Sequence, residues 1–443
     1  VGTLSACPSA HSQPVSTTVE SKGELMAGRE LLRKALAFQE DKVPIDFGST
    51  PVTGMHCIVV EKIRKHFGLE DRPVKICEPY QMLGMIEEDL KEALRVDIDG
   101  IYPKNTMFGF PLQDWKEWRA PWGQLLLVPG NFNTSTDAKG DCYLYPEGDT
   151  SVPPSGRLPD GGYFFDAVIR QNHFDEDDLK VEDNLQEFNP FTEADLEYFR
   201  EYAEAVSKSG RGVIANFGGT GLGDIALVPA MNLKDPRGIR DVEEWYISTV
   251  ARKEYVAEIF DRQTDIAVEN LKRVKEVVGD TVDVTFNCGT DLGTQDSQFL
   301  SEEQYDELYH PYYKKVNDWI HANTRWKTVK HTDGAVFDLI PHFIESGFDI
   351  MNPVQTSAKG MDPKRLKDAY GDRFVFWGAS ADSQHTLPFG KPEEVREEVL
   401  RNAEIFSRGG GYVFNSIHNI QATTPIENVV AFVEAIHEFN GYR

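Results

Sequence analysis

The chain has 443 residues, of which 40% are hydrophobic and 27% charged, and its formal net charge is −26. This composition is typical of a globular protein, and the length suits one large barrel with insertions or two ordinary domains. The negative charge disfavours nucleic-acid binding, because a polyanion would be repelled. No run of about 18 apolar residues is present, so no membrane-spanning helix is predicted.

The N-terminal segment 1–25 is rich in Ser, Thr, Pro and Val and lacks the pattern of a signal peptide. It predicts a disordered leader or a cloning remnant, with Met26 as the candidate native start and residues 26–443 as a single domain. The cysteines are odd in number and form no CxxC pair: Cys7, Cys57, Cys77, Cys142 and Cys288. They indicate neither a disulfide framework nor a zinc ribbon, so a reducing, cytoplasmic location is expected.

Short apolar runs alternate with longer amphipathic segments along the chain, which is the pattern of βα units. Eight strands are predicted, at 43–47, 97–102, 212–217, 282–287, 327–330, 348–352, 374–377 and 412–415. Helices are predicted between the later strands, and one of them is expected to run from Tyr305 to Asn323. Eight strands with crossover helices favour a (β/α)8 TIM barrel, an α/β fold whose active site lies at the carboxyl ends of the strands.

One segment, residues 112–175, breaks this rhythm. It contains Trp115, Trp118 and Trp122, then an apolar run, then turns rich in Pro and Gly. Aromatic strands separated by such turns predict a β-hairpin insertion after the second barrel strand. The insertion could form a lid or a contact in a homo-oligomer, or it could be a covering subdomain that takes no part in the chemistry.

Two strand ends carry candidate substrate and proton-transfer groups. The third strand is followed by Asn216 and a cluster of glycines that lacks the order of a dinucleotide fingerprint. The fourth is followed by Asp291 and Gln295, and the carboxylate of Asp291 is a candidate general acid or base, metal ligand or substrate anchor. The alternative for Asp291 is an Asx turn or a helix N-cap.

Candidate metal ligands follow the fifth and eighth strands. His331 and Asp333 are two residues apart beside Gly334, which permits a sharp turn, and His418 follows the eighth strand. The loops after these strands can meet over the mouth of a barrel. Two imidazoles and one carboxylate would leave a fourth position open, as in a catalytic zinc site. The alternative is a His331–Asp333 pair that serves only a buried hydrogen bond.

Four stretches of the C-terminal half resemble the uroporphyrinogen decarboxylase superfamily, and the resemblance covers essentially residues 26–442. They are DLGTQDSQFLSEEQYDELYHPYYKKV, HTDGAVFDLIPHFIESGFDIMNPVQ, DPKRLKDAYGDRFVFWGASAD and NSIHNIQATTPIENVVAF. The resemblance implies a (β/α)8 barrel, in agreement with the strand count. Decarboxylases of the superfamily carry an Arg-rich N-terminal motif of the kind RQAGRY, whereas the matching region here reads VPIDFGSTPVTGMH.

The cobalamin-dependent methyltransferases of the superfamily bind zinc through a His-x-Cys pair and a later Cys. His331 matches the family histidine, while Asp333 and His418 fall where the two cysteines are expected. The ligand positions thus stay in register, but both thiolates are replaced by harder donors. The replacement implies either a lost metal or a zinc ion with more positive charge, which would be a stronger Lewis acid.

The sequence is also similar to the methyltransferase components of anaerobic O-demethylase systems. That similarity implies transfer of a methyl group from a methoxylated aromatic to a Co(I) corrinoid, which a partner protein would carry. The expected site then has His331, Asp333 and His418 on zinc, with Asp291, His331 and His418 as catalytic residues. The candidate substrate contacts are Asn216, Gln295 and Gln355.

Three alternatives to this interpretation stay open. The first is a metal-independent decarboxylase of the uroporphyrinogen type, which would release CO2 without metal or corrinoid. The second is methyl transfer to a small thiol, which the missing cysteines disfavour. The third is a binding scaffold without turnover, against which the polar residues after the strand ends argue.

Overall fold

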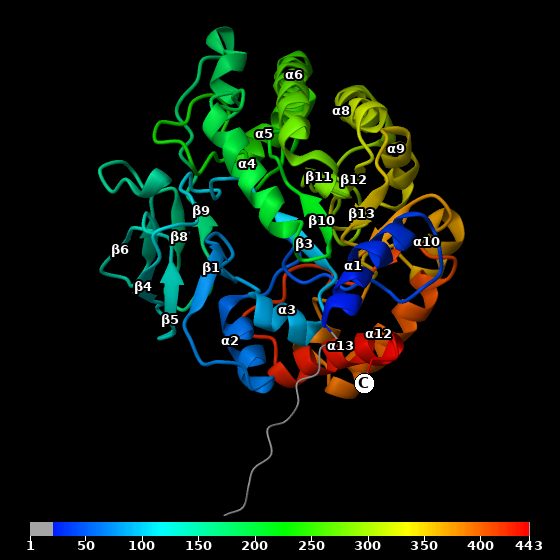
Figure 1. Cartoon of the computed structure of the whole chain (residues 1–443). Helices are drawn as coiled ribbons and strands as arrows, with labels where there is room; N and C mark the ends of the chain where they lie inside the picture. The colour runs from blue at the N-terminus through cyan, green and yellow to red at the C-terminus, as the bar shows by residue number, and fades with distance from the viewer. Residues whose placement is uncertain (1–20, 443) are drawn as a thin grey trace, which may run out of the picture.

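The computed structural model describes residues 21–442, and its centre is a parallel sheet (Figure 1). Among the described residues this sheet has seven strands in the order β15-β14-β13-β12-β11-β10-β3, and every neighbouring pair is parallel. The strands are β3 (Ile98–Ile101), β10 (Gly212–Ala215), β11 (Val284–Cys288), β12 (Lys327–His331), β13 (Ile350–Asn352), β14 (Val375–Trp377) and β15 (Tyr412–Val413). They confirm seven of the eight predicted barrel strands.

The segment 43–47 closes the barrel between the two edges of this sheet. Ile45 forms a parallel bridge with Phe414, and Asp46 N donates to Phe414 O at 2.9 Å. On its other side Ile45 O accepts from Asp97 N at 2.8 Å. The predicted first strand is therefore present as a short bridge rather than a full strand, and the fold is a (β/α)8 barrel.

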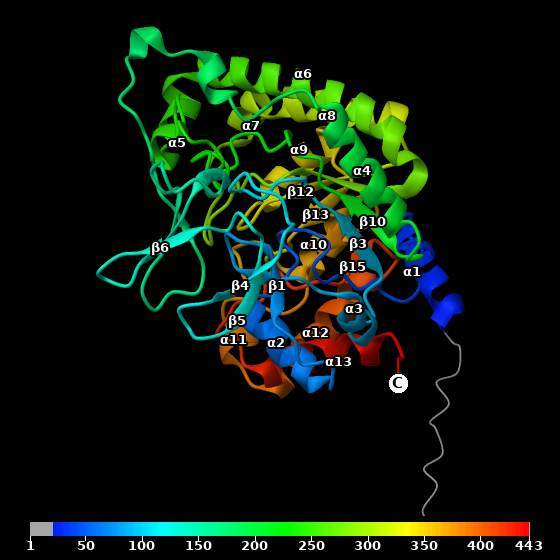
Figure 2. The ribbon, with the colours of Figure 1, turned by 60° about the vertical axis from the view of Figure 1, so that its left-hand side comes forward.

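Helices surround the sheet on its outer side, as Figures 1 and 2 show. Those between the barrel strands and at the C-terminal end are α4 (Glu193–Val206), α5 (Val242–Ala251), α6 (Lys253–Val278), α7 (Glu302–Leu308), α8 (His310–Asn323), α9 (Ile340–Glu345), α10 (Pro363–Tyr370), α11 (Thr386–Phe389), α12 (Pro392–Ser407) and α13 (Ile426–Phe439). The helix predicted from Tyr305 to Asn323 is instead interrupted at Tyr309, because Pro311 lacks the N–H that a continuous helix needs. None of the helices in the described part is both long and apolar enough to span a bilayer.

The interior of the barrel is filled by β-branched side chains. Each strand of the sheet contributes a buried β-branched residue, namely Ile98, Ile214, Val284, Val329, Ile350, Val375 and Val413, and β14 adds Trp377. Leu32 and Leu36 of α1 (Ser21–Leu36) belong to the same cluster, so α1 covers one end of the barrel. Each such burial contributes about 1.5–3 kcal/mol relative to exposure. The opposite end is left for the loops that follow the strands. Of the predicted leader, residues 1–20 lie outside the described residues.

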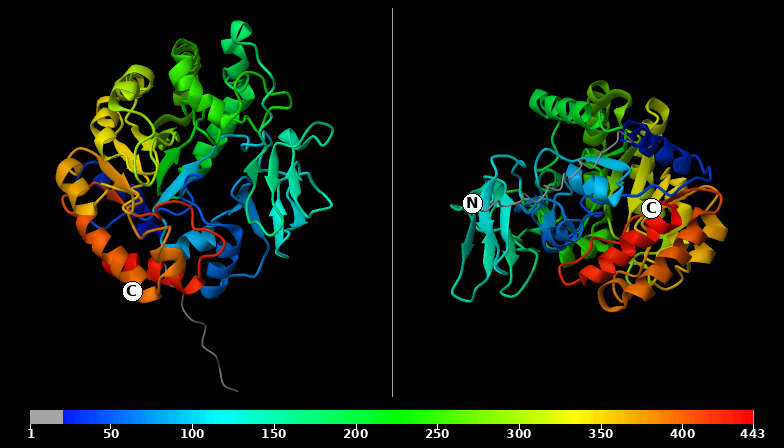
Figure 3. Two further views of the ribbon diagram at one scale, coloured as in Figure 1. Left: turned by 180° about the vertical axis from the view of Figure 1, so that it is seen from behind. Right: turned by 60° about the horizontal axis from the view of Figure 1, so that its bottom comes forward.

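The segments between residues 57 and 167 add two small sheets beside the barrel (Figure 3, left), and all but one of their strand pairs are antiparallel. One sheet has the order β2-β1-β5-β4 and the other the order β6-β7-β8-β9. The predicted insertion, 112–175, contains the hairpin of β4 (Lys116–Arg119) and β5 (Leu125–Val128), followed by β6 (Thr134–Thr136), β7 (Cys142–Leu144), β8 (Gly156–Leu158) and β9 (Asp166–Ala167). The chain before β4 forms α2 (Cys57–His66), and also β1 (Val74–Glu78), β2 (Leu83–Gly84) and α3 (Glu88–Leu94), which the sequence patterns did not predict. In Figure 2 the insertion around β6 extends beyond the barrel end that lies opposite α1.

Candidate metal centre

Strand β12 delivers the first candidate ligand into the mouth of the barrel. Side chains alternate along a strand, so His331 shares the inward face with Val329 of the interior cluster. The chain then turns at Gly334, whose φ is +90°. A Cβ at Gly334 would lie 2.4 Å from the carbonyl carbon of Gly293, so only glycine fits this turn. The turn leaves Asp333 on the mouth side of the loop.

The loop after β15 brings His418 to the same place, because amide side chains fix it to the start of the chain. Asn415 Nδ2 donates to Asp46 O at 3.0 Å. Asn419 accepts from Gly54 N at 2.6 Å and donates to Pro51 O at 2.8 Å. Both anchors are almost fully buried. The hydrogen bonds of Asn415 and Asn419 therefore fix the backbone on both sides of His418.

The three candidate ligands converge as the barrel interpretation requires. One ligand atom each from His331, Asp333 and His418 lie within 4.8 Å of one another. His418 Nε2 is 4.0 Å from Asp333 Oδ2, and the two imidazole rings are 5.8 Å apart between centroids. Ligand atoms on a tetrahedral zinc ion lie about 3.3 Å apart, so small side-chain rotations would bring all three onto one ion. The donor set of two nitrogens and one oxygen fits zinc.

Asn352, which the sequence patterns did not single out, fixes the orientation of His331. Its Nδ2 donates to the backbone carbonyl of Trp377 at 3.1 Å, so its Oδ1 must face His331 Nδ1 at 2.8 Å. Nδ1 therefore carries the proton, and Nε2 is left with a lone pair for a cation. This is the arrangement by which outer residues orient metal-binding histidines.

Two of the predicted functional residues brace the loop that carries Asp333. Asp291 Oδ1 accepts from Asp333 N at 2.9 Å, and Gln355 Oε1 accepts from Gly334 N at 2.9 Å. Asp291 Oδ1 also lies 4.0 Å from His331 Nε2. One oxygen of each side chain is thus committed to the backbone. The second carboxylate oxygen of Asp291 and the amide nitrogen of Gln355 have no such commitment.

Burial disfavours the charged forms of the titratable side chains in this site. It lowers the pKa of His331 and raises the pKa of Asp333, so both groups favour their neutral forms when no cation is present. Burial and the neighbouring Asp291 raise the pKa of Asp224, in the loop after β10, to about 7. The side chains of Asp333 and His418 are 29% and 30% exposed, whereas His331 is 4% exposed. The site is therefore closed on the side of the barrel interior, where His331 lies, and open to solvent on the side of Asp333 and His418.

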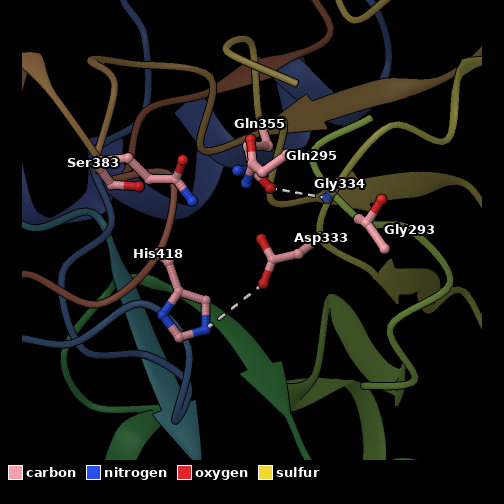
Figure 4. A pocket seen from close by; sticks show the side chains of 9 residues that line it. Gly293, Gln295, Asp333, Gly334, Gln355, Ser383 and His418 are labelled. Carbon is pink, nitrogen blue, oxygen red and sulfur yellow. Dashed lines mark hydrogen bonds and ion pairs between the residues drawn. The ribbon is translucent and has the colours of Figure 1, made fainter. Parts of the chain in front are cut away.

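That open side leads into a hollow of about 260 Å³. It is lined by Gly293, Thr294, Gln295, Asp333, Gly334, Gln355, Ser383, Gln384 and His418. Figure 4 shows Gln295, Gln355 and Ser383 around the same space as Asp333 and His418. Asn216, a predicted substrate contact, is not among the lining residues. Its side chain instead accepts from Gly218 N at 2.9 Å within its own loop.

Comparison with known proteins gives one family. The family model described as "Uroporphyrinogen decarboxylase (URO-D)" matches residues 169–439, which is more than half of the chain. Uroporphyrinogen decarboxylases of Psychromonas ingrahamii and Pseudoalteromonas translucida are each 35% identical, over 80 and 148 residues. These alignments cover 18% and 32% of this chain, and only 22% and 38% of the relatives' own length. A solved structure, "methyltransferase from Methanosarcina mazei", is 15% identical with a TM-score of 0.50, covering 93% of this chain and 98% of that one. It has the same fold.

Proposed function

This chain belongs to the uroporphyrinogen decarboxylase family, and we propose that it is a zinc-dependent methyltransferase within that family. The methyl donor is a methoxylated aromatic, and the acceptor is a Co(I) corrinoid carried by a partner protein. The observation that carries the proposal is the convergence of His331, Asp333 and His418 beside a hollow. The solved methyltransferase of the same fold is compatible with it.

His331, Asp333 and His418 would hold the zinc ion and leave one position open to the hollow. Zinc bound there would supply Lewis acidity, which stabilises negative charge on the leaving oxygen of the donor. Replacement of two thiolates by an imidazole and a carboxylate leaves a more positive centre, which suits an ether oxygen better than a thiolate. Asn352 keeps Nε2 of His331 available for this role.

The remaining side chains bind the donor and move a proton. In the proposed reaction the methyl–oxygen bond breaks, the oxygen keeps the bonding pair and accepts a proton, and the methyl group passes to the partner's corrinoid. Asp291 is assigned the proton transfer, because its second oxygen is uncommitted. Asp224 beside it holds a proton near neutral pH, since its pKa is about 7. Gln295 and Gln355 orient the aromatic ring through its other polar substituents.

The domain organisation and location are proposed on the same grounds. Residues 26–443 form one barrel domain with an insertion at about 112–175, and the insertion is a candidate contact in a homo-oligomer. The cysteines of the described part, Cys57, Cys77, Cys142 and Cys288, are all free, which supports a reducing, cytoplasmic location.

Methyl transfer to a reduced corrinoid protein tests the proposal. The purified chain, loaded with zinc, is mixed with a methoxyarene and a Co(I) corrinoid protein, and the demethylated phenol is measured. We expect His418→Ala to lose at least ~100-fold in rate, as for loss of a metal ligand. His173→Ala, at an exposed histidine outside the site, is the matched control and should retain the rate.

Metal-free protein that transfers methyl groups at the full rate would refute the zinc role. Release of CO2 from a porphyrinogen, without metal or corrinoid, would instead favour the decarboxylase alternative, which the names of the curated relatives support.

A further inference from the structure

We infer that the site selects an uncharged, hydroxylated methyl donor and rejects donors that carry a carboxylate. This inference rests on the proposed function and narrows the class of its substrate. It comes from the charges around the hollow. None of the nine lining residues is Lys or Arg, and all nine lie in the described part of the chain.

Apart from the proposed metal ligands Asp333 and His418, the polar side chains that line the hollow are neutral hydrogen-bonding groups. Gln295, Gln384 and Ser383 offer amide and hydroxyl groups, and Gln355 offers its amide nitrogen because its oxygen is held by Gly334 N. Amides and hydroxyls match phenolic hydroxyls, which donate and accept, and ether oxygens, which accept. They cannot neutralise a carboxylate, which needs a cation or several directed N–H groups once it leaves water.

Two carboxyl groups that are not proposed to bind the metal lie beside the metal centre. Asp291 braces the loop beside the hollow, and burial, together with the neighbouring Asp291, raises the pKa of Asp224. In the proposed complex the ether oxygen faces the metal centre, so a carboxylate elsewhere on the ring points away from that positive charge. A carboxylated donor would therefore lose hydration and meet the carboxylate of Asp291 without a compensating Lys or Arg among the residues that line the hollow.

Two lysines near the site do not change this balance. Lys330 precedes His331 but faces the helices, where Nζ donates to Thr290 O at 2.6 Å, Cys288 Sγ at 3.0 Å and His331 O at 3.1 Å. Its side chain is fully buried and already satisfied. Lys359 contacts the loop only through its backbone, by donating to Gln295 O at 2.9 Å, and its side chain is exposed to solvent.

The size of the hollow points the same way. Pockets for drug-sized ligands measure about 300–1,000 Å³, and about 260 Å³ is at the small end of that scale. A donor with one aromatic ring fits this space. Charge and volume together select a single-ring donor whose substituents are hydroxyl and methoxyl groups.

A matched pair of donors tests the inference. 2-Methoxyphenol and 4-hydroxy-3-methoxybenzoate differ by one carboxylate, and their binding to metal-free and zinc-loaded protein is measured by calorimetry. Methyl transfer from each is measured in parallel. We expect the uncharged donor to bind at least ~10-fold more tightly in both forms, with a similar ratio in kcat/KM.

Variants at the edge of the hollow test whether an added positive charge changes the relative affinity for the two donors. Gln384 is exposed at the edge of the hollow, so Gln384→Arg should fold and raise the affinity for the carboxylated donor at least ~10-fold. Gln384→Met is the matched control, of similar length but without charge, and should not raise it. Lys359→Ala should leave the ratio of the two affinities unchanged.

The inference is overturned if the wild-type protein binds or demethylates the carboxylated donor as well as the uncharged one. It is also overturned if Lys359→Ala abolishes binding of a carboxylated donor, because Lys359 would then be the missing cation. If neither donor binds and no methoxyarene is demethylated, the proposed function fails, and this inference fails with it. That pattern differs from a reversed preference, which leaves the proposed function intact.

Discussion

Replacement of Asn352 by leucine removes the acceptor that orients His331. The side chain of Asn352 is 97% buried, accepts from His331 Nδ1 at 2.8 Å and donates to Trp377 O at 3.1 Å. In Asn352→Leu the Nδ1–H of His331 loses its partner, and the ring is free to rotate or change tautomer. Loss of such an outer contact weakens metal binding by about 10–100-fold, or roughly 1.4–2.8 kcal/mol.

The same change also costs stability, which the assay must separate from metal binding. Two buried polar groups are left without partners, and each costs about 1–3 kcal/mol. Asn317→Leu is the matched control, because Asn317 is a buried asparagine on α8 that accepts from Asn287 and donates to Ser346 O. We expect it to lower the free energy of unfolding by a similar amount with unchanged zinc affinity. Zinc dissociation constants come from competition with a chelator, and unfolding free energies from urea titration.

A third variant isolates the acceptor itself. Asn352→Asp keeps an oxygen for His331 Nδ1 but places the other oxygen against Trp377 O, so it should lose stability while zinc affinity is retained or increased. Equal zinc affinity in the wild-type protein and Asn352→Leu would refute the role assigned to Asn352. Equal loss of affinity in Asn317→Leu would show that the effect is only one of stability.

Further variants test the turn and the barrel interior. Gly334→Ala should destabilise the protein by about 2 kcal/mol or more and weaken zinc binding, because the added Cβ meets backbone atoms; normal zinc affinity in this variant would contradict the account of the turn. Burial raises the pKa of Asp46, which accepts from Trp377 Nε1, to about 6, so the folded state binds its proton more tightly than the unfolded state. The unfolding free energy should therefore fall by roughly 3 kcal/mol as the pH rises from about 3 to about 7. In Asp46→Asn this part of the slope should be absent, and an identical slope, measured by urea titration at several pH values, would show that Asp46 does not titrate in this way.

The barrel could be predicted from the sequence because its signal is local. Each strand is a short apolar run, and the inward residues, such as Ile98 and Val375, follow the alternation that a sheet requires. The break at Tyr309 could also have been predicted, since Pro311 is visible in the sequence. Strand β1 was missed because one of its partners, β5, lies far along the chain, and β2, its other partner, has only two residues and so gives no periodic pattern.

The candidate ligands could be proposed from their positions after strand ends, but their supporting residues could not. Asn352 ends a strand as His331 does, yet nothing in the sequence tells which side chain it faces. Asp291 was expected to be catalytic and Gln355 to contact substrate, and their bonds to the backbone of Asp333 and Gly334 depend on three loops meeting. Asn216 also follows a strand end and was expected to contact substrate, but its side chain accepts a hydrogen bond from the backbone of its own loop.

X-ray absorption at the zinc edge of the loaded protein tests the central claim most directly. The account predicts one zinc ion per chain, with imidazole nitrogens and oxygens at about 2.0–2.1 Å and no sulfur at about 2.3 Å. His331→Ala and His418→Ala should each remove one imidazole from the spectrum or abolish binding. A sulfur shell, or no bound zinc in metal-replete protein, would contradict the claim that His331, Asp333 and His418 form one metal centre.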